Sequence, residues 1–281
     1  MTATYRPAAP IWCAGCGHFG VQAVLSRAIA ELGIPSHDVM VLAGIGCSGT
    51  IQNNLGTYGY HALHGRVLPT ATGVHLANPD LTVIATGGDG DGYAIGMGHL
   101  VHTFRRNPSL LYLVMNNGVY GLTKGQDSPT AAADPGGGFD AIALGLSLST
   151  TTFLARGSAS RTDQLLRLTV AALEHARARQ GLAFLEVLSP CVTYNDTYPS
   201  WETALYDLDT DPNHRLGDRA AAFKAVTELG EQGRLAVGLV YRDEERSAPP
   251  AAHPASEAVD APGLVDRYRA ILEQYSVARG P

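Results

Sequence analysis

One stretch of the chain, residues 80–126, constrains the fold more than any other. It contains two short apolar segments, 81–86 and 110–115, with a helical pattern over 93–106 between them. Apolar, β-branched segments of this length are typical of strands buried in a parallel sheet. The order of strand, helix and strand therefore predicts a βαβ unit with two parallel strands side by side.

Polar residues follow both strands of this unit. Gly88, Asp89 and Gly90 form a predicted turn after the first strand, and Asn116 and Asn117 follow the second. Because parallel strands end at one edge of a sheet, we expect Asp89 and Asn117 to face the same site. Their oxygens suit Mg²⁺, which keeps open positions for phosphate, and the next helix offers N–H groups to an anion. A diphosphate held through Mg²⁺ fits this pattern, although the tripeptide alone would also fit a simple turn.

The segments GGDGD and NNGVYG resemble the thiamine diphosphate signature, and the continuation YGLTKGQDSPT is similar to the β subunits of 2-oxoacid:ferredoxin oxidoreductases. The resemblance covers about residues 10–200. It implies an α/β protein with the thiamine-diphosphate-binding fold, a parallel sheet with helices on both faces. It also implies that Mg²⁺ is held by Asp89, by the Asn117 side chain and by the backbone carbonyl of Val119. The residues that it implies as cofactor contacts are Ile45, Gly46, Cys47, Ser48, His64, Gly88, Gly90, Asp91, Gly121 and Leu122.

Four cysteines are present: Cys13 and Cys16 form a C-x-x-C pair, and Cys47 and Cys191 lie far from it. Disulfides are disfavoured because nothing marks the chain as exported, and structural zinc sites typically use two close pairs, not one. Four thiolates are enough for a [4Fe–4S] cluster if the fold brings them together. Cys47 and Cys191 each follow a predicted strand, at the edge expected for the magnesium site; alternatively, both are small buried residues.

In the resembled β subunits, the motifs WCAGCGHFG and GIGCS and a late cysteine bind one [4Fe–4S] cluster beside the thiamine ring. The resemblance therefore implies that all four cysteines are cluster ligands. It also implies that His64, in the sequence HGR, lies against the cofactor and acts in catalysis. An imidazole can donate to a phosphate oxygen or polarise a carbonyl.

Composition excludes some partners. With a net charge of −6 and no basic stripe, the chain is not expected to bind nucleic acid, which requires clustered Lys and Arg. No apolar run approaches membrane-spanning length, and no leader pattern appears, so we expect a cytoplasmic protein that does not enter a membrane.

Periodicity predicts the remaining elements. Helices are expected over 19–32, 67–77, 141–147, 161–179 and 220–229, and further strands over 39–45, 151–155, 183–188 and 234–241. We expect about five of the strands to form a parallel sheet. Segment 48–65 lacks a clear period and is predicted to be an active-site loop, and the Gly- and Pro-rich segment 127–140 is predicted to be a lid or an interface loop.

The chain is predicted to divide near residue 200. Residues 1–200 would bind thiamine diphosphate and the cluster, and residues 201–281 would form an extension that contacts a partner. Within the extension, a Pro- and Ala-rich linker over 247–262 precedes a terminal helix over 264–275.

The resembled family converts a 2-oxoacid, coenzyme A and oxidised ferredoxin into an acyl-CoA, CO₂ and reduced ferredoxin. Thiamine enzymes also need a glutamate at the aminopyrimidine end, usually from another domain, and no second cofactor-binding domain is evident here. We therefore expect an α subunit as partner, in an α₂β₂ assembly, and an inactive isolated chain.

The resemblance implies that Leu122 and Lys124, in the sequence GLTKG, lie beside the thiamine ring, so we expect the substrate to contact them, with Thr50 as a further candidate. Lys124 could pair with a distal carboxylate, which favours 2-oxoglutarate over pyruvate, or it could contact the α subunit. The reaction could run toward succinyl-CoA or as reductive carboxylation. Two rival classes are a non-oxidative thiamine decarboxylase or synthase with structural cysteines, and an iron–sulfur electron-transfer subunit without thiamine.

Overall fold

The computed structural model describes residues 7–131 and 138–243, together with a few positions between 263 and 273. The predicted linker over 247–262 and most of the predicted terminal helix lie outside the described residues. The middle of the predicted lid or interface loop, residues 132–137, also lies outside them.

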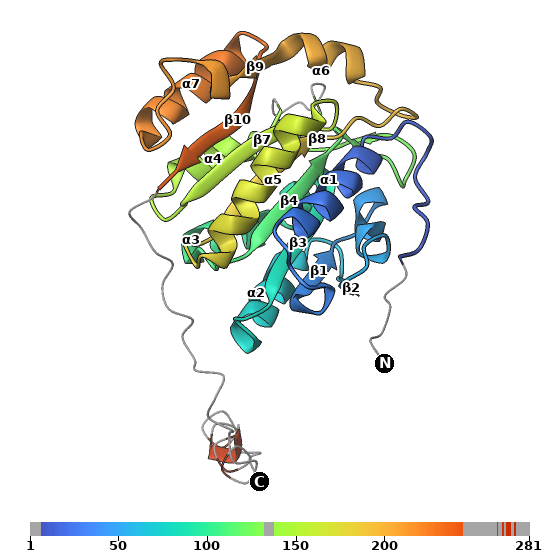
Figure 1. Ribbon diagram of the computed structural model, residues 1–281, viewed down its shortest axis with the longest axis vertical. Helices are drawn as coiled ribbons and strands as arrows, with labels where there is room; N and C mark the ends of the chain where they lie inside the picture. The colour runs from blue at the N-terminus through green and yellow to red at the C-terminus, as the bar shows by residue number, and fades with distance from the viewer. Residues whose placement is uncertain are drawn as a thin grey trace, which may run out of the picture.

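An eight-stranded sheet forms the centre of the molecule, in the order β2-β1-β3-β4-β8-β7-β10-β9 (Figure 1). The strands are β1 (Val39–Ala43), β2 (Tyr58–His61), β3 (Thr82–Gly88), β4 (Leu111–Asn116), β7 (Phe153–Ser158), β8 (Ala183–Leu188), β9 (Leu205–Asp207) and β10 (Leu235–Arg242). Neighbours from β2 to β7 are parallel, β10 is antiparallel to β7, and β9 is parallel to β10. The five predicted parallel strands are confirmed as β1, β3, β4, β8 and β7.

Helices cover both faces of this sheet, as predicted (Figure 1). They are α1 (His18–Glu31), α2 (Val67–Ala77), α3 (Met97–Arg106), α4 (Ala141–Ser147), α5 (Thr162–Arg177), α6 (Tyr198–Ala204) and α7 (Arg219–Glu231). Helices α1 and α5 pack on one face, and α2, α3, α4 and α7 pack on the other. Successive residues of β4 alternate between the two cores: Leu111, Leu113 and Met115 enter the first, and Tyr112 and Val114 the second. Side chains on both sides of a strand are buried only when both faces are covered, which explains its unbroken apolar sequence.

The segment 48–65 contains regular structure that its sequence did not indicate. Residues Cys47–Asn53 form a 3₁₀ helix, η2, and β2 adds a sixth parallel strand at the edge of the sheet. All four residues of β2 are exposed. An edge strand without a buried face has no alternation of apolar and polar residues, so periodicity does not reveal it.

The predicted Gly-Asp-Gly turn is wrong. Strand β3 continues to Gly88, the chain is already helical at Asp89, and a π-helical turn, η3 (Asp91–Ile95), precedes α3. Glycine permits this path, because a methyl group at Gly96 would lie 2.5 Å from the carbonyl oxygen of Asp91. Such π-turns are frequent at functional sites.

The sheet contains strands from both sides of residue 200, because β10 pairs with β7. The predicted division of function at that residue stays a prediction. Within the part of the chain that is described, no helix combines the length and the apolar character needed to cross a membrane.

The buried His175 of α5 should make the fold sensitive to acid. Its imidazole is fully buried, 3.0 Å from the hydroxyl of Thr152, and burial, together with the nearby Arg242, lowers its pKa to about 4. Between the ordinary pKa near 6.5 and this value, the unfolded chain binds a proton that the folded chain does not. The free energy of unfolding should therefore fall as the pH drops from 6.5 to 4, by about 3 kcal/mol from this residue.

Urea unfolding at a series of pH values measures this effect. Replacing His175 by glutamine removes the titrating group, so the variant should lose less stability over that pH interval. An equal loss in the variant and the original chain would contradict the assignment.

Candidate active site

A cavity of about 200 Å³ opens at the carboxyl ends of the parallel strands. It is lined by His18, Ile45, Gly46, Cys47, Ser48, His64, Gly88, Asp89, Gly90, Asp91, Met115, Asn117, Val119, Tyr120, Gly121, Leu122 and Thr123. Every residue predicted as a cofactor contact or Mg²⁺ ligand is in this set. The fold therefore brings these residues to one site, although they come from four separate segments of the chain.

The two predicted metal-binding side chains follow β3 and β4, which are adjacent in the sheet. Asp89 is 1% exposed, and its Oδ1 lies 3.4 Å from the backbone nitrogen of Asn117. The amide oxygen of Asn117 accepts a hydrogen bond from the backbone of Val119, which shapes the loop. Burial raises the pKa of Asp89, and hydrogen bonds from Ser128 and Thr130 oppose that rise. A cation beside this carboxylate would further favour its ionised form.

The donor set and the space around it fit a magnesium-bound diphosphate. One carboxylate, one amide oxygen and one loop carbonyl are hard oxygen ligands, which leaves coordination positions of Mg²⁺ open for phosphate. Close packing explains the glycines: a methyl group at Gly90 would lie 2.3 Å from the ring of Tyr120, and one at Gly88 would lie 3.1 Å from the hydroxyl of Ser48. The chain is helical from Asp89 onward, so backbone N–H groups without helical partners lie at this edge.

Asp91 lines the cavity, but one of its oxygens is engaged in the protein. Oδ1 accepts hydrogen bonds from the backbone of Ile45 (2.9 Å) and Gly65 (2.8 Å), and it lies 2.8 Å from Nδ1 of His64. A carboxylate in this position requires Nδ1 of His64 to carry the proton, which leaves Nε2 as the second functional atom of the imidazole. Asp91 therefore joins the loop after β1 to the histidine predicted to act in catalysis.

The four cysteines come together at the same edge. The arm before α1 carries Cys13 and Cys16, and it is fixed by bonds from the Trp12 indole to the Cys47 carbonyl (2.7 Å) and from the Gly17 backbone to the Pro190 carbonyl (3.1 Å). Cys47 follows β1, and Cys191 follows β8. All four are free thiols.

Gly121 lines the cavity and also lies next to the thiols of Cys47 and Cys191. A methyl group at Gly121 would lie 3.6 Å from the sulfurs of both Cys47 and Cys191. Burial, with a smaller contribution from the other three cysteines, raises the pKa of Cys16 to about 11, and burial also raises that of Cys47. These thiols are protonated in the metal-free chain, so binding of a metal cluster would release protons.

The thiols do not converge on a single point. Among residues 7–131 and 138–243, no group of three or more His, Cys, Asp or Glu residues could hold one metal ion. A four-iron cluster is wider than one ion and takes one thiolate at each iron, so its ligands stand farther apart. Four cysteines around a shared space fit that requirement.

Two candidate substrate contacts lie outside the cavity lining. Lys124 is exposed in the turn between β5 (Val119–Tyr120) and β6 (Gln126–Asp127), with a φ of 76° that is uncommon for a residue other than glycine. Such strained positions cluster at functional sites. Thr50 donates a hydrogen bond to the Cys47 carbonyl at 3.1 Å, so it supports the cysteine segment.

Sequence reasoning missed several residues of this site. His18, Met115, Tyr120 and Thr123 line the cavity. His18 is 1% exposed, lies 2.7 Å from the hydroxyl of Ser189, and has a pKa lowered to about 4 by burial. Its position two residues after the C-x-x-C pair was the available signal. Nothing in the sequence marks Met115, which belongs to an apolar strand.

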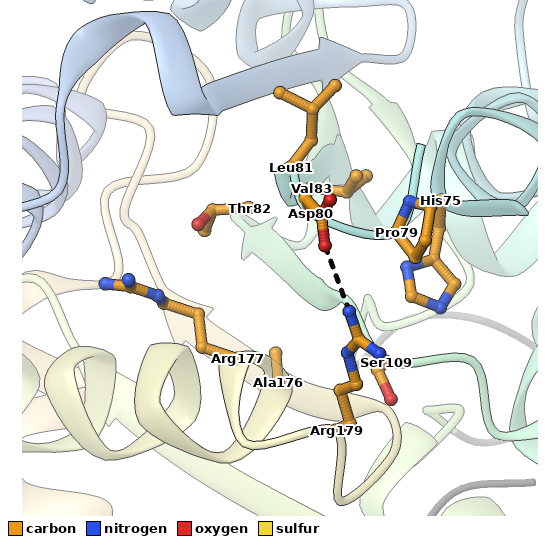
Figure 2. Close-up of a pocket in the computed structure, with 10 residues that line it drawn as sticks. All are labelled: His75, Pro79, Asp80, Leu81, Thr82, Val83, Ser109, Ala176, Arg177 and Arg179. Atoms are coloured by element: carbon orange, nitrogen blue, oxygen red, sulfur yellow. Dashed lines mark hydrogen bonds and ion pairs between the residues drawn. The ribbon is translucent and has the colours of Figure 1, made fainter. Parts of the chain in front are cut away.

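A second cavity, of about 210 Å³, lies at the opposite edge of the sheet (Figure 2). It includes residues at the start of β3 and the end of α5, and Arg179 forms an ion pair with Asp80 there at 3.1 Å. Burial and the nearby Arg179 lower the pKa of His75 in its wall. None of the predicted site residues lines this cavity, so the one at the carboxyl ends is the candidate active site.

Comparisons with known proteins agree with this assignment. Residues 43–187 match the thiamine pyrophosphate enzyme C-terminal TPP-binding domain, and residues 191–255 match the C-terminal region of the pyruvate ferredoxin oxidoreductase β subunit. The chain is 41% identical to the 2-oxoacid:ferredoxin oxidoreductase subunit beta of Saccharolobus solfataricus, over 83% of this chain and 82% of that one. It is 38% identical to the 2-oxoglutarate oxidoreductase subunit KorB of Mycobacterium tuberculosis, over 66% of this chain and 51% of that one.

A solved structure has the same fold. The 2-oxoglutarate:ferredoxin oxidoreductase of Magnetococcus marinus, determined with 2-oxoglutarate, coenzyme A and succinyl-CoA bound, aligns with a TM-score of 0.79 and 32% identity, over 96% of this chain and 89% of that one. The family-model match spans more than half of the chain, and it contains both predicted metal-binding loops. The chain therefore belongs to the β subunits of the thiamine diphosphate-dependent 2-oxoacid:ferredoxin oxidoreductases.

Proposed function

We propose that this subunit, together with an α subunit, catalyses the coenzyme A-dependent oxidative decarboxylation of 2-oxoglutarate to succinyl-CoA and CO₂, and passes two electrons singly to ferredoxin. One observation carries the proposal: the cavity that contains the predicted Mg²⁺ ligands also contains Cys47, and Gly121 adjoins the sulfurs of Cys47 and Cys191. A cofactor in the cavity would lie next to the thiols, as electron transfer requires.

The chain's own residues would hold two cofactors. Asp89, Asn117 and the Val119 carbonyl would hold Mg²⁺ and through it the diphosphate. Bound thiamine diphosphate supplies an electron sink for the loss of CO₂. Cys13, Cys16, Cys47 and Cys191 would hold a [4Fe–4S] cluster, whose chemistry is one-electron transfer. Because clusters and free thiols persist in a reducing compartment, we assign the reaction to the cytoplasm.

The proposed substrate is supported by Lys124 and by the relatives. The M. tuberculosis relative is described as a 2-oxoglutarate oxidoreductase subunit, and the M. marinus structure contains 2-oxoglutarate. Lys124 is an exposed cation that directly follows Leu122 and Thr123, which line the cavity. A lysine there would pair with the distal carboxylate that 2-oxoglutarate has and pyruvate lacks. Nε2 of His64 would hold or release a proton beside the cofactor.

The α subunit would cover the open side of the cavity. Around it, Leu63, Ile95 and Leu122 are exposed apolar side chains, with exposed fractions of 75%, 58% and 58%. An exposed apolar patch beside an active site is typical of a protein interface. We propose that the α subunit covers these residues and supplies the glutamate that activates the thiamine ring.

Anaerobic co-purification with the α subunit tests the function. The complex should contain thiamine diphosphate and reduce ferredoxin with 2-oxoglutarate and coenzyme A, whereas the isolated chain should be inactive. A colourless complex that decarboxylates without reducing ferredoxin would instead support a non-oxidative thiamine enzyme. An iron-containing complex without thiamine diphosphate would support an electron-transfer subunit.

Replacing Lys124 by methionine should raise the KM for 2-oxoglutarate by about 10- to 100-fold, since a charge-assisted hydrogen bond contributes about 1.5–3 kcal/mol. The KM for pyruvate should not change. Methionine is unbranched like lysine, so the backbone at φ 76° is affected little. Lys224→Met is the matched control, because Lys224 lies in α7 beside Glu228. Equal effects on both substrates would rule out the role of Lys124.

A further inference from the structure

Two hydroxyl groups hold one oxygen of Asp89. The side chains of Ser128 and Thr130 both donate to Oδ2, at 2.5 Å and 2.7 Å. Oδ1 is approached by the Asn117 backbone nitrogen at 3.4 Å. The two oxygens of this buried carboxylate therefore differ: Oδ2 has two short hydrogen bonds, and Oδ1 has a long one.

The proton of Thr130 has three acceptors within reach: Asp89 Oδ2, the side-chain oxygen of Asn116 at 2.9 Å and the hydroxyl oxygen of Ser128 at 3.2 Å. The Asn116 oxygen already accepts a hydrogen bond from the Gly118 backbone at 3.0 Å. A charged carboxylate is the stronger acceptor. The Thr130 proton is therefore directed to Asp89, as is the proton of Ser128.

The neighbouring amide is itself held in place. The nitrogen of Asn116 donates to Oε1 of Glu186 at 3.1 Å, and Oε2 of Glu186 accepts from Arg156 at 2.6 Å. These side chains are buried, at 6%, 1% and 5% exposure. A buried network with its members bonded to one another fixes orientation. The Thr130 hydroxyl therefore lies between Asp89 and Asn116, whose side chain this buried network holds in place.

We propose that Ser128 and Thr130 are positioning residues for a divalent cation. By holding Oδ2, they turn Oδ1 toward the cation, beside the Asn117 side chain and the Val119 carbonyl. The inference rests on the magnesium site of the proposed function and assigns it two residues that do not touch the cation. Outer hydrogen-bond partners of this kind orient metal ligands, and their loss typically lowers metal affinity about 10- to 100-fold.

The test is a Mn²⁺ titration of the full chain with its α subunit, stripped by chelator and supplied with thiamine diphosphate. Electron paramagnetic resonance at room temperature measures free Mn²⁺. Thr130→Val keeps the shape and removes the hydroxyl, and Ser128→Ala removes the other hydroxyl. Each should weaken Mn²⁺ binding about 10- to 100-fold. Thr130→Ser keeps the hydroxyl and should restore most of the affinity.

Thr169→Val is the matched control. Thr169 is fully buried in α5, and its hydroxyl bonds to the Leu165 carbonyl at 2.7 Å, so the variant loses a buried hydroxyl away from the site. Its Mn²⁺ affinity should not change. Unchanged affinity in Thr130→Val and Ser128→Ala would overturn the inference, and so would equal losses in Thr130→Val and Thr130→Ser. If the unmodified complex binds no Mn²⁺ with thiamine diphosphate, the magnesium site of the proposed function fails instead.

Discussion

Replacing Asp89 by asparagine should abolish metal-dependent binding of thiamine diphosphate. Asp89 is the one charged ligand among the three proposed for Mg²⁺, and it is buried. An amide of the same shape would remove the negative charge and turn one oxygen into a donor group facing Ser128 and Thr130, or facing the cation. Since loss of an outer partner alone typically lowers metal affinity about 10- to 100-fold, loss of the ligand itself should lower it more than about 100-fold.

Thiamine diphosphate retained after gel filtration in Mg²⁺ measures this loss, without relying on turnover. Asp80→Asn is the matched control, because it makes the same change of charge just before β3, where Asp80 pairs with Arg179 at 3.1 Å and lies outside the lining of the candidate active site. Asp80→Asn should keep the cofactor, whereas Asp89→Asn should lose it. Equal retention in both variants would remove Asp89 from the metal site.

The sequence was sufficient to predict the part of the fold that carries the site. The apolar segments that became β3 and β4 are buried on both faces, so their composition alone identifies them. Adjacent parallel strands end together, so the order of the elements predicts Asp89 beside Asn117. The resemblance added Ile45, Ser48 and His64, all of which line the same cavity.

What the sequence did not reveal depends on tertiary contacts. Strand β2 has no buried face, so it has no periodic signal. Ser128 and Thr130 lie in a segment whose Gly and Pro content indicated an irregular loop, and irregular loops have no period from which a direction follows. Their hydrogen bonds to Asp89 form only because the segment after β6 returns to that residue. The π-helical turn at Asp91 likewise depends on the packing around Gly92 and Gly96.

Replacing Cys191 by serine should remove most of the iron and with it the reduction of ferredoxin. In the proposed site, each of the four thiolates binds one iron, and the hydroxyl of serine is a much harder ligand than a thiolate. The same loss should follow substitution of Cys47. The competing interpretation, that both are small buried residues, predicts full iron content in both variants, since serine is close to cysteine in size.

Assays of iron and acid-labile sulfide on anaerobically purified protein distinguish cysteines that bind a cluster from cysteines that are only small buried residues. We expect about four irons in the original chain, absorption near 400 nm that dithionite bleaches, and strong loss of both in Cys191→Ser. Val192→Ala is the control, because it alters packing next to Cys191 and keeps all four thiols. Cys191 lies outside the cavity lining, so Cys191→Ser should still retain thiamine diphosphate with Mg²⁺. A variant that keeps the diphosphate and loses the iron would separate the two sites; one that keeps its iron would remove Cys191 from the cluster.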